Sequence, residues 1–294
     1  MNAIEQEREH LSATSLKQLQ SCALQFRLQR LDGLSRSHRS PALITGGIYH
    51  GVLASALLML RDDQDVTKDK LVEIYEERWD AELKISEPPI RWSKKATLKD
   101  QHELGRALVG AWFEQGLPIF KAAEQILAVE MPFRVPVFNR HGEVLETPLE
   151  GFIDVVYKEV GGQTIVVDHK TSASKFGDVA LELDLQPTVY RHALRFLGYD
   201  DNAVFRFHVI TKAKSPKLSI VEVPRGEDDF DRLHWLCENA EQLIRSGLFL
   251  PATGSDWRCE SCEFLAGCKA AHRDLLTPDP EPTVAAKAVA QPVA

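Results

Sequence analysis

Residues 151–157 read GFIDVVY and residues 164–172 read TIVVDHKTS, and a Gly161-Gly162 break separates them. Both segments are apolar runs of β-strand type, yet the first carries Asp154 in its interior and the second carries Asp168 and Lys170. A carboxylate buried in a strand is costly unless it is paired or coordinates a metal ion. The three charged residues therefore need one shared explanation.

The register of this hairpin decides whether the three charged side chains meet. In a strand, residues i and i+2 point to the same face, so Asp168 and Lys170 lie side by side. A strict two-residue turn would set Asp154 opposite His169, whereas one extra loop residue or a bulge sets Asp154 opposite Lys170 and aligns all three. We predict the second register. The apolar residues 165–167 indicate a buried strand, which favours a metal-binding site over a surface ion pair.

The overall composition is that of an ordinary globular protein. The chain has 294 residues, of which 44% are hydrophobic and 27% charged, enough for a sizeable core. Its longest apolar run, residues 52–60, is shorter than the ~20 residues of a membrane span. The charged N-terminus lacks a signal-peptide core. We therefore expect a cytoplasmic protein with no membrane partner.

A net charge of −8 argues against a surface coated with basic residues, so nucleic-acid contacts would have to come from local clusters of Lys and Arg. Three clusters are candidates, although each alone is more typical of a solvated face. They are Arg27, Arg30, Arg36 and Arg39; Arg91, Lys94, Lys95 and Lys99 around Trp92; and Lys212, Lys214 and Lys217.

Hydrophobic periodicity predicts helices followed by a sheet. Helices are expected over 12–31, with Ser12 or Thr14 as N-cap, over 48–60, opened by Thr45-Gly46-Gly47, and over 68–83 and 98–115. From residue 124 the period changes to two, which predicts a three-stranded meander ending at Lys170. A helix over 179–197, strands over 204–210 and 218–223 and a helix over 229–246 follow. This order predicts an α/β fold with a mixed central sheet.

The predicted organisation is a single domain over residues 12–275. It comprises a helical part (12–120), a catalytic core (121–225) and a C-terminal helix with a cysteine loop (226–275). Residues 1–11 are expected to be a flexible N-terminus. Residues 276–294 are rich in Pro, Ala and Val and poor in charge, which predicts a disordered tail.

Clustered cysteines in a chain without a secretion signal indicate metal ligands rather than disulfides. Cys259, Cys262 and Cys268 form a compact predicted loop near the C-terminal end. Cys22 lies on the inner face of the first helix, where a buried free thiol is the simpler interpretation. Cys237 has no neighbouring ligands and is predicted to be a core thiol.

Seven motifs occur in order along the chain. They are Ser12-x-Thr14-x-Leu16 through Cys22-x-x-x-Phe26, Gly46-x-x-x-His50, Glu130, Gly151-x-Ile153-Asp154, Asp168-x-Lys170-Thr171, Gln186-x-x-x-Tyr190 and Cys259-x-x-Cys262-x5-Cys268. Together they resemble the RecB-type branch of the PD-(D/E)XK nuclease superfamily. The cysteines are similar to those of its members with an iron–sulfur cluster, namely the AddB nuclease domain, exonuclease V and the CRISPR-associated adaptation nuclease. One departure is Ala23, where the family usually has proline.

The resemblance implies a restriction-endonuclease-like core with a metal-dependent nuclease site. The expected catalytic residues are Asp154, Asp168, Lys170, Glu130, Gln186 and Tyr190, and the expected ligands of Mg²⁺ or Mn²⁺ are His50, Asp154, Asp168 and the main-chain carbonyl of His169. Oxygen ligands suit Mg²⁺, and a nitrogen ligand shifts the preference toward Mn²⁺. Lys170 would orient or deprotonate the attacking water, and Gln186 and Tyr190 would line the path of the DNA.

The resemblance also implies a [4Fe–4S] cluster of structural role on Cys22, Cys259, Cys262 and Cys268, with zinc as the alternative occupant. Because Cys22 stands more than two hundred residues before the other three, such a group would clamp the two ends of the chain together.

The expected function is cleavage of DNA from single-stranded ends, in repair, recombination or CRISPR adaptation. The chain has no Gly-x-x-x-x-Gly-Lys-Ser/Thr loop for ATP, so a helicase motor or a CRISPR adaptation partner would be a separate protein. Two alternatives stay open. One is a structure-specific or restriction-type endonuclease, and the other is a catalytically silent DNA-binding scaffold subunit of a helicase–nuclease complex.

Overall fold

A computed structural model describes residues 10–94, 96–173, 177–252 and 257–276 of the chain. The flexible N-terminus predicted for residues 1–11 falls, except for its last two residues, outside the described residues. The disordered tail predicted for residues 276–294 lies outside them as well, apart from residue 276. Lys95 of the second basic cluster is also outside the described part.

A five-stranded mixed sheet forms the centre of the molecule, in the order β1-β2-β3-β4-β5. The strands are β1 (Gln125–Val135), β2 (Leu149–Lys158), β3 (Thr164–Ser172), β4 (Val204–Thr211) and β5 (Leu218–Glu222). The first three strands form the predicted antiparallel meander, β4 runs parallel to β3, and β5 returns antiparallel to β4. The predicted α/β fold with a mixed central sheet is therefore confirmed.

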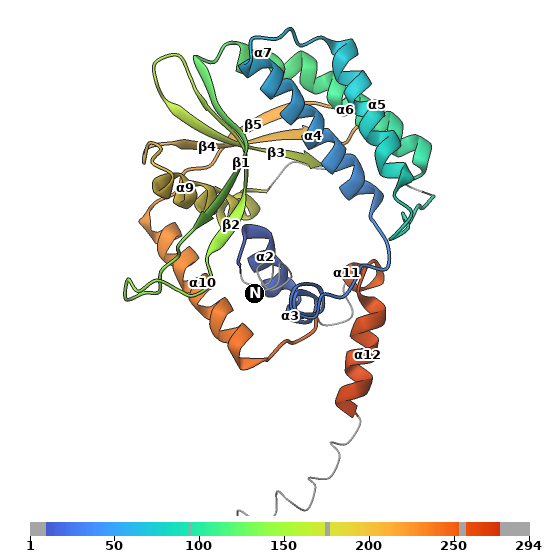
Figure 1. Cartoon of the computed structure of the whole chain (residues 1–294), viewed down its shortest axis with the longest axis vertical. Helices are drawn as coiled ribbons and strands as arrows, with labels where there is room; N and C mark the ends of the chain where they lie inside the picture. The colour runs from blue at the N-terminus through green and yellow to red at the C-terminus, as the bar shows by residue number, and fades with distance from the viewer. Residues whose placement is uncertain (1–9, 95, 174–176, 253–256, 277–294) are drawn as a thin grey trace, which may run out of the picture.

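Helices cover both faces of this sheet and create two cores (Figure 1). One face packs on α4 (Pro41–Arg61), α5 (Lys68–Lys84), α6 (Leu98–Gln115) and α7 (Leu117–Lys121). The other face packs on α2 (Ala13–Ser21), α9 (Gln186–Phe196) and α10 (Glu227–Ser246). Sheet residues alternate between the two cores, as Val155 and Val156 do. Both faces of the sheet are thus buried, which accounts for the continuous apolar runs in its central strands.

The first predicted helix is interrupted at Cys22. Ser12 caps α2 with a capping box shared with Ser15, as the sequence predicted. Cys22 then adopts an extended conformation with φ −162°, and its sulfur accepts a hydrogen bond from the backbone of Gln25. The short helix α3 (Ala23–Phe26) and a π-helical turn, η1 (Arg27–Leu31), follow. The interruption allows Cys22 to cap α3 instead of lying within a helical face.

The prediction that Thr45-Gly46-Gly47 opens the second helix is wrong. Helix α4 begins at Pro41, a residue suited to the first helical turn because its missing N–H would be unpaired there anyway. His50 therefore lies in the third turn. By length and a hydropathy of 1.7, α4 is apolar enough to cross a membrane, but its buried residues form the core against the sheet, which accounts for that composition.

The extra loop residue predicted for the β2–β3 hairpin is present, but the predicted pairing of Asp154 opposite Lys170 is wrong. Glu159 and Gln163 close a three-residue loop that contains Gly161 and Gly162, both at positive φ. Regular pairing then runs up to Val155 opposite Val167. The extra loop residue therefore precedes the glycine pair, and continuation of this register would place Asp154 opposite Asp168 rather than Lys170.

Two further segments differ from the prediction. The helix expected over 179–197 is split into α8 (Asp178–Leu183) and α9, because Asp184 is extended and its carboxylate accepts a hydrogen bond from the backbone of Gln186. The predicted cysteine loop contains α11 (Trp257–Glu260) and α12 (Leu265–Leu276). Helix α10 ends, as expected, at Gly247 with a left-handed φ of 70°.

Candidate active site

The charged residues predicted from the central hairpin meet at the end of β3, between α4 and α9. Asp168 is only 1% exposed and Asp154 8% exposed. The paired strands separate beyond Val155, so the backbone N–H of His169 donates instead to Oδ2 of Asp154 at 2.8 Å. The carboxylate thereby satisfies a buried donor, and its own burial is partly compensated.

A break in strand alternation brings a third carboxylate to the same place. Ile153 and Val156, three residues apart, pack in one core, although strict alternation would place them on opposite faces. The register of β1 and β2 sets Glu130 opposite Asp154, and Glu130 has a left-handed φ of 47°, a costly conformation for a residue with a side chain. The irregular part of the β1–β2 pairing therefore contains the two residues whose carboxylates reach the site, Glu130 and Asp154.

Three of these side chains form a group that could hold a metal ion. One nitrogen of His50 and one carboxylate oxygen each of Glu130 and Asp154 all lie within 4.8 Å of one another. Nδ1 of His50 is 3.3 Å from Oδ2 of Asp154. Two hard oxygen donors and an imidazole nitrogen are a suitable donor set for Mg²⁺ or Mn²⁺.

A second network holds Asp168. Nζ of Lys170 lies 2.7 Å from its Oδ2, and Nε2 of Gln186 donates to its Oδ1 at 2.5 Å. Lys170 also donates to Oε1 of Gln186 at 2.8 Å, and Tyr190 contacts both Gln186 and Asp168. Lysine, glutamine and tyrosine are therefore oriented by one buried carboxylate.

The two aspartates have opposite electrostatic environments. Burial raises the pKa of Asp168 to about 7, although the ammonium of Lys170 acts in the opposite direction. Burial also disfavours ionisation of Asp154, but the hydrogen bond and positive charge of His50 outweigh it and hold the pKa of Asp154 below its usual value. Burial and the charge of Asp154 raise the pKa of Glu130. Three crowded carboxylates of this kind favour a bound cation.

The ring of His169 packs among buried aromatic rings, whereas its backbone N–H contacts the site. It is 2% exposed, and among the described residues neither ring nitrogen has a hydrogen-bond partner. The rings of Trp112, Phe120 and His208 surround it, with centroids 5.5–6.4 Å away. Burial lowers the pKa of His169 to about 4, so the ring stays neutral. The predicted ligand, its main-chain carbonyl, belongs to the strand that this ring anchors.

The four cysteines predicted to bind one metal group lie together, although they come from both ends of the described chain. Cys22, Cys262 and Cys268 contact a small core of Leu24, Leu28 and Phe264, and Cys259 is close enough to influence the charge of the others. Backbone N–H groups of Ala252 and Phe264 donate to sulfurs at 3.4 Å. Cys237 is fully buried in the main core, as predicted.

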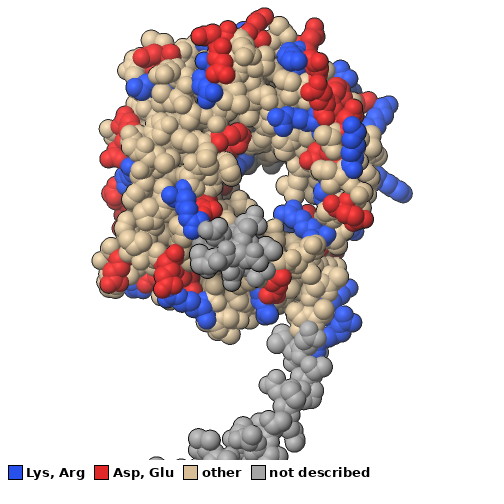
Figure 2. Space-filling view, viewed as in Figure 1, with Lys and Arg blue, Asp and Glu red and all other residues tan. Residues whose placement is uncertain are grey.

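Some arginines of the basic clusters form ion pairs, and others line one shared cavity. Arg39 lies 2.7 Å from Glu82 and also donates to carbonyl groups, and Arg27 lies 3.2 Å from Asp32. Arg30 and Arg36 instead line a cavity together with Arg91, and Arg258, which the sequence did not single out, joins them. Figure 2 shows an opening in this region of the molecule with Lys and Arg side chains on its rim.

Fold and site together define a protein of the restriction-endonuclease-like class, with a metal-suited carboxylate group beside an Asp-x-Lys pair. Residues 10–269 match the PD-(D/E)XK nuclease superfamily, and the chain belongs to that superfamily. Nucleases of this superfamily use divalent metal ions, for which the His50, Glu130 and Asp154 group is suited.

One solved structure agrees with the fold assignment. A crystal structure named "Putative exonuclease" from Eubacterium rectale is similar, with a TM-score of 0.55 and 14% identity, covering 98% of this chain and 96% of that chain. The structure of SSO0001 covers 91% of this chain and 94% of its own at 16% identity, but its TM-score of 0.39 is too low to establish a shared fold. No curated protein sequence matched this chain.

Proposed function

We propose that the protein is a metal-dependent DNA exonuclease of the RecB-type branch that hydrolyses phosphodiester bonds at single-stranded ends. The observation that carries the proposal is the network of Asp168, Lys170 and Gln186 directly beside the metal-suited group of Asp154 and His50. Superfamily membership supports nucleic-acid cleavage.

In the proposed site, His50, Asp154, Asp168 and the carbonyl of His169 hold Mg²⁺ or Mn²⁺, and Glu130 supports the same group. When bound, the metal would activate water and neutralise charge on the phosphate. The carboxylate of Asp154 is held in place before any metal binds, because the backbone N–H of His169 donates to it.

Lys170 has the position for handling the attacking water. Its side chain is 30% exposed, and its ammonium contacts Asp168, so the residue reaches both the carboxylate network and the solvent. From there it would orient the water or take its proton, and it would offset the negative charge that develops on the phosphate. Gln186 and Tyr190 keep it aligned and line the cavity through which a nucleic acid would reach the site.

The shape of the molecule supports attack from a free end. Figures 1 and 2 place an opening between α4, α2 and the sheet, next to the end of β3. A strand that enters such an opening does so most easily by a free end, whereas an endonuclease needs a cleft that accepts a continuous strand. This favours the exonuclease over the restriction-type alternative.

The cysteines are proposed to hold a [4Fe–4S] cluster, with zinc as the alternative. Cys22, Cys262 and Cys268 lie around one small core, and backbone N–H groups donate to the sulfurs of Cys22 and Cys262. Such an environment suits thiolate ligands of either group. A separate helicase or CRISPR adaptation protein is the proposed partner, in DNA repair, recombination or adaptation.

The test is cleavage of end-labelled single-stranded DNA with Mg²⁺ or Mn²⁺, comparing linear and circular strands. Linear DNA should be degraded and circular DNA spared. Lys170→Ala should abolish cleavage and leave DNA binding intact, whereas Lys158→Ala, at the opposite end of the neighbouring strand, should keep full activity. Equal rates on circles would indicate an endonuclease, and binding without cleavage by the unmodified protein would indicate the scaffold.

A further inference from the structure

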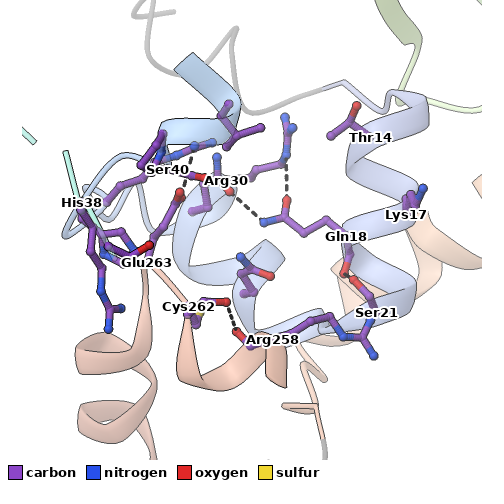
Figure 3. A pocket seen from close by; sticks show the side chains of 18 residues that line it. Thr14, Lys17, Gln18, Ser21, Arg30, His38, Ser40, Arg258, Cys262 and Glu263 are labelled. Atoms are coloured by element: carbon purple, nitrogen blue, oxygen red, sulfur yellow. Dashed lines mark hydrogen bonds and ion pairs between the residues drawn. The ribbon is translucent and has the colours of Figure 1, made fainter. Parts of the chain in front are cut away.

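A cavity of about 720 Å³ lies between the N-terminal helices and the cysteine segment, on the side of the molecule shown in Figure 3. We call it the arginine pocket. Its charged lining residues are Lys17, Arg30, Arg36, Arg91, Arg258 and Glu263. Five cations and one carboxylate line it, in a chain whose net charge is −8, although Lys17 also lies 4.0 Å from Asp184. Such a local concentration of positive charge favours an anionic ligand.

The cations come from segments far apart in the sequence. Lys17 lies on α2, Arg30 in η1, Arg91 in the segment before α6, and Arg258 on α11. Their convergence is therefore a product of the fold and not of a single basic stretch. Side chains of the polar residues Gln18, Gln25 and Gln29 complete the wall.

The arginines of the pocket differ in their interactions. Arg36 is neutralised by Glu263 at 3.2 Å, whereas Arg30 contacts the neutral side chain of Gln18 at 3.3 Å. Within the described part of the chain, no carboxylate lies within ion-pair distance of Arg30 or Arg91. Burial and the nearby charge of Arg36 lower the pKa of Arg30, as expected for a cation held without a counter-charge.

A second cavity of about 730 Å³ shares lining residues with both this pocket and the candidate active site. Thr14 and Arg30 line both cavities, and the second one is also lined by Gln186 and Tyr190. Gln186 contacts Asp168 directly. Arg30 therefore lies between the carboxylate network and the remaining arginines.

We propose that the arginine pocket is a second nucleic-acid site, which binds the phosphodiester backbone of a single strand on the far side of Arg30 from the scissile phosphate. The inference rests on the proposed nuclease function and adds a substrate-binding site to it. The cations are spread along two adjacent cavities. A nucleic-acid backbone, which carries phosphates at regular intervals, matches this spread better than a single compact anion would. Arginine forks are well matched to phosphate oxygens.

The experiment measures equilibrium binding of fluorescent oligothymidylates of increasing length to the Lys170→Ala protein, which should not cleave them. Affinity should rise with length until the strand reaches the pocket. Arg30→Ala with Arg91→Ala should abolish that rise and leave the shortest strands unaffected. We expect about tenfold weaker binding of long strands for each arginine lost. The salt dependence should flatten by about 1.4 in logarithmic slope for two phosphate contacts.

Two variants control for charge and folding. Arg61→Ala removes one arginine at the far end of α4, roughly 30 Å from Pro41 in the pocket wall, and should change nothing. Arg30→Lys should retain most of the salt dependence. An unchanged length dependence in the folded double variant, judged by its melting temperature, overturns the pocket alone. Absence of cleavage by the unmodified protein overturns the proposed function whatever the arginine variants do, and cleavage by the Lys170→Ala protein overturns the role of Lys170.

Discussion

A substitution at Gly47 can test where α4 begins, at Pro41 as observed or at Thr45-Gly46-Gly47 as the sequence indicated. In the structure Gly47 lies within the helix, and a Cβ added there would meet nothing within 4 Å. Glycine inside a helix costs about 1 kcal/mol relative to alanine. Gly47→Ala should therefore raise the free energy of unfolding by about 1 kcal/mol, or the melting temperature by about 2 °C.

The matched control is Gly105→Ala in α6, which offers the same gain in helix propensity without the space. A Cβ at Gly105 would come 2.6–2.7 Å from two ring carbons of Tyr75, whose hydroxyl donates to the carbonyl of His102. Overpacking of this kind costs roughly 1–3 kcal/mol, so Gly105→Ala should be destabilising.

Urea unfolding of the three proteins side by side is the assay for Gly47. If Gly47→Ala is neutral or destabilising, the residue lies at a helix start, where glycine is preferred over alanine, and our account of α4 is refuted. Gly47 also precedes His50 by three residues on the same helical face. Full cleavage activity in Gly47→Ala would show that the added methyl group leaves the site accessible.

Two further variants test local features of the fold. Glu130→Gly and Glu130→Ala both remove the carboxylate and should reduce cleavage equally, but Gly should be more stable by about 1 kcal/mol because φ is 47°; equal urea midpoints would contradict the strained backbone. Arg39→Ala should cost about 2–3 kcal/mol, since its side chain is 14% exposed and its guanidinium is bonded to Glu82 and to carbonyl oxygens. Arg36→Ala, which removes an arginine whose side chain is 41% exposed, should cost under about 1 kcal/mol, and similar losses in both variants would disprove the distinction.

The sheet could be predicted from the sequence because its evidence is local. Apolar runs with period two and a glycine pair between them are properties of neighbouring residues, and they identified β2, β3, the buried Asp168 and the half-buried Lys170. The position of the extra loop residue could not be predicted, because either side of the glycine pair gives the same parity. The structure resolves it through the pair Glu159 and Gln163.

Glycine was misleading in α4 for a related reason. Gly46 and Gly47 have the composition of a helix start, yet tertiary packing of the α4 face against the sheet overrides a weak local preference. The arginine pocket could not be predicted from neighbouring residues at all. Arg258 and Arg30 are separated by most of the chain, and only folding shows that they line one cavity while Arg39, in the same sequence cluster, is used for structure.

The cysteine site and the arginine pocket share a wall, which links the proposed cluster to substrate binding. Cys262 lines the pocket, and Arg258 precedes Cys259 by one residue. A group bound by Cys22 and the three C-terminal cysteines would hold α11 against η1, and would thus set the position of Arg258 relative to Arg30. Much of its binding free energy would also be folding free energy, because it closes nearly the whole chain.

Cys22→Ser should therefore remove the brown colour and the absorbance near roughly 400 nm expected of an iron–sulfur group, lower the melting temperature, and weaken binding of long single strands more than of short ones. Cys237→Ser, in the main core, should keep the iron. Metal and sulfide analysis of anaerobically purified protein decides the occupant: about four irons and four sulfides support the cluster, and one zinc without sulfide contradicts it. If Cys22→Ser loses its metal yet binds strands of every length as the unmodified protein does, the pocket wall does not depend on the cysteines, and the proposed link between the two sites is wrong.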